Sequence, residues 1–307
     1  MAESGTTPSS PVNSGNLQRN QYNQDKESHM VTQIEETYIK DSKKRAQQFF
    51  WKEYLVLVLA GLLGVIAALP AAWSVIAQTA AIANIPAQLL AAGQLIQSAF
   101  WLLLAVGVGL WLSPKTGLGA PLLRGYFAGE KVSDKLRSRL PGSVLLAFLA
   151  TLVVVTLDRL FFLPRMPGFS SAISQLSGWQ GLLSSLYGGL TEEILTRLLL
   201  VTLLAWILSR FSHTSGGKPS ITSMRIAIFG VALLFGLGHL PATLASTPFS
   251  TIVFARAILL NGILGVLFGY LYWKRGLESS MTAHFTSDLL VHVILPFLFL
   301  LGIGRSF

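Results

Sequence analysis

The chain has 307 residues, of which 52% are hydrophobic and 12% are charged. Soluble globular domains carry about twice that share of charged residues, so this composition excludes an ordinary water-soluble domain and indicates a protein that lies in the bilayer. The formal net charge is +9, but the basic residues fall mostly in the N-terminal tail and between apolar runs, where lipid head groups account for them. No nucleic-acid partner is therefore expected. The absence of cysteine excludes disulfides and thiolate metal ligands.

The apolar residues are distributed unevenly along the chain. Residues 1–50 are polar and are expected to form a disordered tail. Beyond them come apolar runs close to the ~20 residues that a spanning helix needs. No cleavable signal peptide is expected, because the first run begins more than fifty residues into the chain. We predict an all-α bundle of seven or eight transmembrane helices, whose clearest runs are 54–78, 88–112, 143–163, 180–209, 225–240, 251–273 and 281–303.

Basic residues between the runs predict the orientation. They are concentrated before the first run, in 113–142 and in 210–225, and all three segments are expected in the cytoplasm together with the N-terminus. Segment 113–142 also contains several glycines, which favours a solvated loop with at most a short helix at the interface. The expected organisation is thus the tail 1–50, N-terminal spans with the basic loop over 51–140, and a C-terminal core over 141–307.

The fourth run contains three charged residues, Glu192, Glu193 and Arg197. Each costs about 2.5–3.5 kcal/mol at the centre of a spanning helix, so it needs a partner, a wet cavity or a task. Glu193 and Arg197 are spaced i,i+4 in the order that favours an ion pair. Glu192 lies about 100° around the helix and faces elsewhere, which makes it the candidate working carboxylate. The alternative is that all three only hold neighbouring helices together.

Three histidines lie in or at the ends of apolar runs. His239 closes the fifth run just before Pro241, where the helix is expected to end or kink. His284, Asp288 and His292 recur every four residues and share one face of the last helix. One free carboxylate and imidazoles on different helices suit amide hydrolysis. Glu192 with His239 would activate a water, and His284 with Asp288 would orient it or stabilise the oxyanion.

Two other readings remain open at this point. A proton-coupled transporter also uses buried Glu, Asp and His side chains, although here these residues cluster in the later runs. A non-catalytic membrane scaffold would use the same buried groups only to hold helices together. A serine nucleophile is disfavoured because the chain has no Gly-x-Ser-x-Gly sequence.

The motifs that carry these residues resemble those of the CPBP (Abi) family of intramembrane proteases, which includes the type II CAAX prenyl endopeptidases. The resemblance covers about 140–303. It rests on Glu-Glu-x-x-x-Arg at Glu192, Glu193 and Arg197, on Phe-x-x-x-His at Phe235 and His239, and on His-x-x-x-Asp/Asn at His284 and Asp288.

The resemblance implies catalytic roles for Glu192, His239 and His284, with Glu193, Arg197 and Asp288 in support. It also implies a membrane-associated protein or peptide as substrate and a location in the plasma membrane of a bacterium. The prenyl proteases usually have Asn where this chain has Asp288. A carboxylate is a poor oxyanion donor unless protonated, so Asp288 would instead orient His284.

A metal ion is left open by this constellation. Glu192, His239, His284 and Asp288 offer the oxygen and nitrogen ligands that zinc accepts. No His-Glu-x-x-His sequence occurs, and a metal-free glutamate mechanism is the alternative. We therefore assign no cofactor and keep zinc as a possibility.

Overall fold

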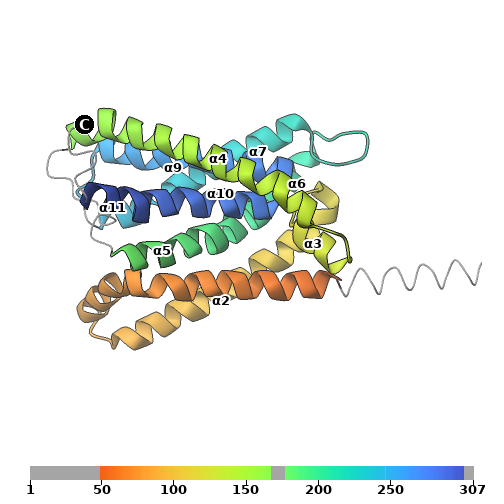
Figure 1. Cartoon of the computed structure of the whole chain (residues 1–307). Helices are drawn as coiled ribbons and strands as arrows, with labels where there is room; N and C mark the ends of the chain where they lie inside the picture. Colours follow the sequence, from red (N-terminus) through yellow and green to blue (C-terminus); the bar gives the residue numbers. More distant parts are fainter. Residues whose placement is uncertain (1–48, 167–176, 246, 301–307) are drawn as a thin grey trace, which may run out of the picture. The chain divides into compact units, whose positions relative to one another are not determined.

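The computed structural model describes residues 49–166, 177–245 and 247–300 (Figure 1). Residues from Trp51 onward form one compact unit. The predicted disordered tail lies almost entirely outside the described residues. Every regular element described is a helix, which confirms the all-α prediction.

The first part of the unit contains the helices that precede residue 166. They are the candidate span Phe49–Ile82, α2 (Ala87–Thr116), the short α3 (Pro121–Phe127) and α4 (Ser133–Leu157), which continues through a π turn, η1 (Asp158–Phe162), and a 3-10 turn, η2 (Leu163–Arg165).

The second part contains a long helical run and then three further helices. The run comprises α5 (Gly178–Leu186), two π-helical segments, η4 (Tyr187–Glu192) and η5 (Ile194–Val201), and α6 (Thr202–Ser209). It is followed by α7 (Ile221–Gly238), the short α8 (Leu240–Leu244), α9 (Thr251–Arg275), α10 (Leu277–Leu289), η6 (Leu290–Ile294) and α11 (Leu295–Leu300).

Six helices in the described part of the chain are long and apolar enough to cross a membrane. They match six of the seven predicted runs. The remaining run, 180–209, is helical from Gly178 to Ser209 but is not one of the six. Its three charged residues, Glu192, Glu193 and Arg197, lower its hydropathy in the middle.

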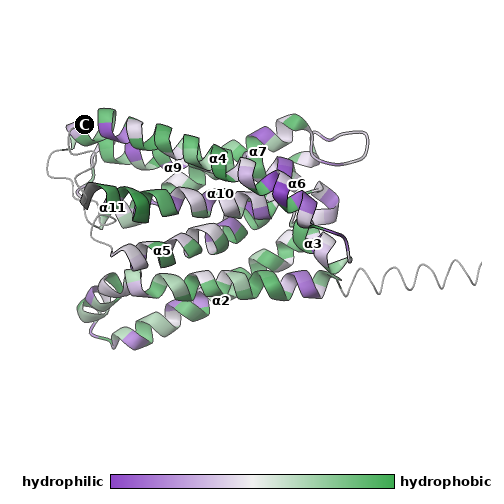
Figure 2. Cartoon of the chain, viewed as in Figure 1, coloured by the Kyte–Doolittle hydropathy of each residue, from purple (hydrophilic) through white to green (hydrophobic). Residues whose placement is uncertain are grey.

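Side chains are distributed as expected for a protein with a lipid-facing surface. Large apolar residues such as Leu59, Trp101 and Phe229 are exposed, whereas Glu193 and Arg197 are fully buried. So much exposed apolar surface would be unusual for a soluble monomer. Figure 2 shows the apolar colouring along most of the helices, with hydrophilic residues gathered near α6. The chain is therefore an integral membrane protein.

The segment 113–142 differs from the expected solvated loop. α4 already begins at Ser133, so the basic residues up to Arg139 lie on its first turns. α3 is packed rather than free, because its Leu122 and Leu123 amides donate to the Glu278 carboxylate at 2.9 and 2.8 Å. The short helix that the sequence allowed is therefore present as α3, but its packing was not predicted, because these contacts join residues 156 and 155 positions apart.

A second contact fixes α3 to the first span. Arg124 donates to both carboxylate oxygens of Glu53, at 2.8 and 3.1 Å, and Glu53 is only 2% exposed. Hydrogen bonding to Glu53 raises the pKa of Arg124, so the guanidinium keeps its positive charge. α3 thereby joins the first span to the start of α10.

Close helix contacts place the later helices around α10. α10 packs against α4, α9, α5 and η4, and α7 has its most extensive contact with α9 (Figure 1). Gly265 and Gly269 of α9 face α7, where an added Cβ would lie 3.1 Å from Ala232 and 2.8 Å from Ile228. Small residues at these two positions let the backbones approach, and this brings α7, α9 and α10 together around the charged middle of the run 178–209.

Candidate active site

The predicted site residues come from three parts of the bundle. Glu192, Glu193 and Arg197 lie at the junction of η4 and η5. His239 follows the last residue of α7, and α10 carries His284 and Asp288 on successive turns. π-helical turns are rare and are frequently found at functional sites, and here they flank the two glutamates.

Glu193 is the centre of a buried network. Its Oε1 lies 3.0 Å from Arg197 Nη1 and 2.8 Å from His284 Nδ1, and its Oε2 accepts a hydrogen bond from Ser280. Glu193 and Arg197 side chains are 0% and 1% exposed. A buried carboxylate is tolerated when it is paired and its oxygens are hydrogen-bonded, and Glu193 meets both conditions.

Arg197 is held from several sides. Its Nη2 donates to the Gly265 carbonyl of α9 at 3.2 Å, and its Nη1 donates to Thr196 at 2.6 Å. The guanidinium also lies over the rings of Phe235 and Phe268, 4.8 and 5.3 Å from their centroids. A cation over an aromatic face is stabilised further when water is excluded. The ion pair that the i,i+4 spacing predicts is therefore present and also ties η5 to α9.

His284 is fixed in position by its neighbours. Its ring stacks on Phe268 with centroids 4.5 Å apart and meets Phe235 edge-on at 5.5 Å. A carboxylate only accepts hydrogen bonds, so Nδ1 carries the proton that is donated to Glu193. The other nitrogen, Nε2, then points to Glu192 Oε2 at 3.7 Å and to Asp288 Oδ2 at 3.6 Å.

These two longer separations differ in kind from the contacts of Glu193. They exceed a direct hydrogen bond and are of the length at which a bridging water is expected. The side chains of Glu192 and Asp288 are 23% and 20% exposed, whereas that of His284 is 5% exposed. The site therefore has a sealed side, formed by Glu193 and Arg197, and an accessible side, formed by Glu192 and Asp288.

His239 joins this group through an aromatic ring. Its Nδ1 lies 2.7 Å from the Phe235 carbonyl, and its ring packs edge-on against Phe235 at 4.6 Å. Because a carbonyl only accepts, Nδ1 is the donor and Nε2 of the neutral ring is left as an acceptor. Among the described residues His239 has no direct hydrogen bond to Glu192, and the action of both residues on a shared water stays a prediction. The imidazole that lies beside Glu192 is His284.

Asp288 also differs from its expected role. The sequence assigned it the orientation of His284, but the hydrogen bond that orients the ring comes from Glu193, while Asp288 faces Nε2. His292, one turn further, lies on η6, and its Nδ1 is buried without a hydrogen-bond partner in the described structure. It shares a helix with His284 but does not join the hydrogen-bonded network.

Sequence reasoning missed two residues that build the site. Ser280 donates to Glu193, and its Oγ also lies 2.8 Å from the Phe268 carbonyl. Phe268 supplies the surface on which His284 stacks. Ser280 lies four residues before His284, on the same helical face, and that spacing is a signal that could have found it. No comparable signal marks Phe268.

The donor atoms of the four possible zinc ligands are not arranged around one point. Within the described ranges no group of three or more Asp, Glu or His side chains is arranged to hold a metal ion. Nδ1 of His284 and Nδ1 of His239 are already used in protein contacts. The four residues named as possible zinc ligands therefore do not form a ligand set in this arrangement.

Comparison with known proteins identifies the region that holds these residues. Residues 174–290 match the family model described as type II CAAX prenyl endopeptidase Rce1-like. This region of the chain is therefore similar to the Rce1-like endopeptidases. It contains every predicted catalytic and supporting residue, but it is shorter than the expected 140–303. No curated protein and no solved structure was found to match the chain.

Proposed function

We propose that this protein is an intramembrane endopeptidase that hydrolyses a peptide bond of a membrane-associated protein or peptide. The observation that carries the proposal is the position of Glu192. Its carboxylate is accessible and lies 3.7 Å from Nε2 of His284, whose opposite nitrogen is held by the buried Glu193. Within a region similar to the Rce1-like endopeptidases, this arrangement is suited to holding and activating one water.

In the proposed reaction Glu192 is the general base. It removes a proton from a water whose second hydrogen is accepted by Nε2 of His239, and the water oxygen bonds to the substrate carbonyl carbon. His284, with Nδ1 donating to Glu193 and a proton on Nε2, donates to the oxyanion that forms. Glu192 then returns its proton to the amide nitrogen as the carbon–nitrogen bond breaks, which yields a carboxylic acid and an amine. The acid then loses its proton, which the amine accepts.

The supporting residues act by holding these groups. Glu193 fixes the tautomer and direction of His284, and Arg197 keeps Glu193 charged in a dry environment. Asp288, beside Nε2 of His284, favours a proton on that nitrogen. The oxyanion donor is thus an imidazole set between carboxylates, and Asp288 itself does not need to be protonated.

We also propose seven spans with the N-terminus in the cytoplasm, counting the run 178–209 as the fourth. The bundle supports this, because basic segments predicted to share one side lie together: Lys115 and Lys218 line the same cavity. A charged run is tolerated at membrane depth where its charges are paired and buried in protein, as Glu193 and Arg197 are.

The test compares protein termini in membranes of cells that express wild type, Glu192→Gln or Glu130→Gln at equal levels. Glu130 is an exposed glutamate that pairs with Lys135 far from the site in sequence, so its variant makes the same chemical change elsewhere. We expect wild type and Glu130→Gln to produce a set of cleaved protein termini that is missing with Glu192→Gln. The uncut precursors of these termini should accumulate with Glu192→Gln. Identical termini in all three samples, with Glu192→Gln folded, would exclude the protease and favour the scaffold or transporter.

A further inference from the structure

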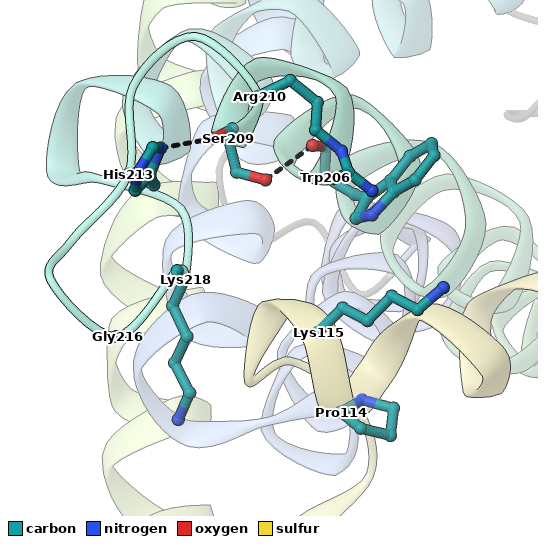
Figure 3. Close-up of a pocket in the computed structure, with 9 residues that line it drawn as sticks. Pro114, Lys115, Trp206, Ser209, Arg210, His213, Gly216 and Lys218 are labelled. Carbon is teal, nitrogen blue, oxygen red and sulfur yellow. Dashed lines mark hydrogen bonds between the residues drawn. The ribbon is translucent and has the colours of Figure 1, made fainter.

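A cavity of about 530 Å³ lies away from the glutamate–histidine site, at the ends of two helices. It is lined by Pro114 and Lys115 at the end of α2, by Trp206 and Ser209 of α6, and by the loop that follows. Figure 3 shows Lys115 and Arg210 on one side of the cavity and Lys218 on the other. Both contributing segments belong to the basic regions expected in the cytoplasm.

The lining of this cavity is strongly cationic. Lys115, Arg210 and Lys218 contribute three positive charges, and His213 adds an imidazole. The lining residues, all of them described, include no carboxylate. None of the three cations forms an ion pair within the part of the chain that the structure describes. Three charges without acidic partners repel each other, which an anion in the cavity would relieve.

Two tryptophans contact two of the three cations, Lys115 and Arg210. Lys115 Nζ lies 3.4 Å from the centroid of Trp111 and 5.7 Å from that of Trp206, and the Arg210 guanidinium lies 4.6 Å from Trp206. Such contacts reduce the freedom that Lys and Arg lose on binding a ligand. Tryptophan is also enriched at the level of lipid head groups, which places the cavity at the membrane boundary.

The helix ends oppose anion binding, but more weakly than the cations favour it. The C-termini of α2 and α6 each carry about half a negative charge from unpaired carbonyls. Part of this charge is already neutralised, because the Gly117 amide donates to Ser113 O at 2.8 Å and His213 Nδ1 lies 3.0 Å from Ser209 O. Three full positive charges outweigh the remainder.

We propose that this cavity is a binding site for a phosphate group. Lys and Arg around a pocket between helices, on the side that faces anionic lipid, are the chemistry that recognises a phospholipid head group. The same chemistry would accept a soluble phosphate compound. Its position beside Trp111 and Trp206 favours the phosphate of an anionic phospholipid of the surrounding leaflet. This site is independent of Glu192 and of the proposed proteolysis.

The experiment measures lipid binding to the full chain, purified in detergent, by native mass spectrometry. Phosphatidylglycerol is titrated against phosphatidylcholine with the same acyl chains, with and without inorganic phosphate as competitor. The pocket variant is Lys115→Gln/Arg210→Gln/Lys218→Gln. The control variant, Lys131→Gln/Lys135→Gln/Arg137→Gln, removes the same charge from exposed residues outside the cavity. The single variant Lys218→Gln lies in an exposed loop and provides the comparison if the triple pocket variant does not fold.

We expect wild type to bind one phosphatidylglycerol in preference to phosphatidylcholine. The affinity for phosphatidylglycerol should be at least tenfold lower in the pocket variant and nearly unchanged in the control variant. A Lys or Arg near an anionic surface contributes roughly fivefold in affinity, so Lys218→Gln alone should weaken binding by about that factor. Competition by inorganic phosphate that depends on the pocket residues would also support the site, because it would show that the phosphate group is the part recognised. Equal weakening by the pocket and control variants, or no preference for phosphatidylglycerol, would overturn the proposal.

Discussion

The Nδ1 atom of His284 lies 2.8 Å from Oε1 of Glu193, and the same oxygen lies 3.0 Å from Nη1 of Arg197. One buried carboxylate thus holds an imidazole of α10 and a guanidinium of its own helix. Because Glu193 fixes Nδ1, it also decides that Nε2 faces Glu192. The supporting ion pair and the reactive side of the site are therefore mechanically connected.

Replacing Glu193 by Gln should impair both stability and activity. The change leaves the buried Arg197 charge unpaired and removes the acceptor that orients His284. Breaking a buried pair in this way costs about 3–5 kcal/mol. We expect a large loss of unfolding free energy for the detergent-purified protein and loss of the terminus-generating activity.

The double variant Glu193→Gln/Arg197→Met separates these two effects. It removes the unpaired charge, so we expect part of the stability to return. Activity should stay low, because His284 still lacks its carboxylate. Full activity in the double variant would contradict the proposed role of Glu193 in positioning His284.

Gly188 leaves the space in which the site residues meet. A Cβ at this position would collide with the Asp288 carboxylate and lie 3.0 Å from His284 Nε2. Gly188→Ala should therefore displace Asp288 and lower activity by an order of magnitude or more, while the helix itself tolerates alanine. Gly238→Ala is the matched control, since an added Cβ there meets no atom within 4 Å although the residue precedes His239. Peptide-bond cleavage and thermal unfolding of both variants provide the measurement.

Two neighbouring serines on α10 give a second matched comparison. Ser280 donates to Glu193, whereas Ser279 is buried with its hydroxyl unpaired in the described structure. A hydrogen bond to a charged group contributes about 1.5–3 kcal/mol, so Ser280→Ala should be destabilising by that order. Ser279→Ala should be neutral or stabilising, because no partner is lost. Equal effects on unfolding free energy would show that Ser280 is not a working partner of Glu193.

The parts of the structure that could be predicted from the sequence are those set by local spacing. Apolar runs of about twenty residues located the six helices that are long and apolar enough to cross a membrane, since length and hydropathy can be read directly from the sequence. The Glu193–Arg197 pair was predictable for the same reason, because residues four apart share a helical face. The three motifs lie within residues 174–290, the region that matches the Rce1-like model.

The parts that could not be predicted depend on long-range packing. His284 lies 91 positions from Glu193, and nothing in the local pattern shows that it, rather than His239, comes to lie beside Glu192. The Glu53–Arg124 and Glu278–α3 contacts also join residues far apart in the sequence. Hydropathy also misses the polar first turns of α4, because they continue the helix beyond its apolar part. Which polar residues come into contact depends on how closely the helices approach each other at their glycines.

A pair outside the site shows what a purely structural ion pair looks like in this bundle. Arg256 of α9 donates from Nε and Nη2 to the two oxygens of Asp158 in η1, both at 2.7 Å. Here each carboxylate oxygen is bound by the arginine. At the glutamate pair, both oxygens of Glu193 also have partners, supplied by Arg197, His284 and Ser280. Glu192, in contrast, stays accessible and faces an imidazole nitrogen.

Asp158→Asn should therefore destabilise the protein without affecting the chemical step. We expect a loss of about 1–3 kcal/mol in unfolding free energy, because a bidentate, partly buried pair is replaced by a weaker neutral contact. Cleavage per folded molecule should remain close to that of wild type, and the swapped variant Asp158→Arg/Arg256→Asp should recover part of the stability. Glu192→Gln should show the opposite pattern, with normal unfolding and no cleavage. If both variants lost stability and cleavage together, Glu192 would be acting as a helix lock, and the scaffold interpretation would account for the buried charges.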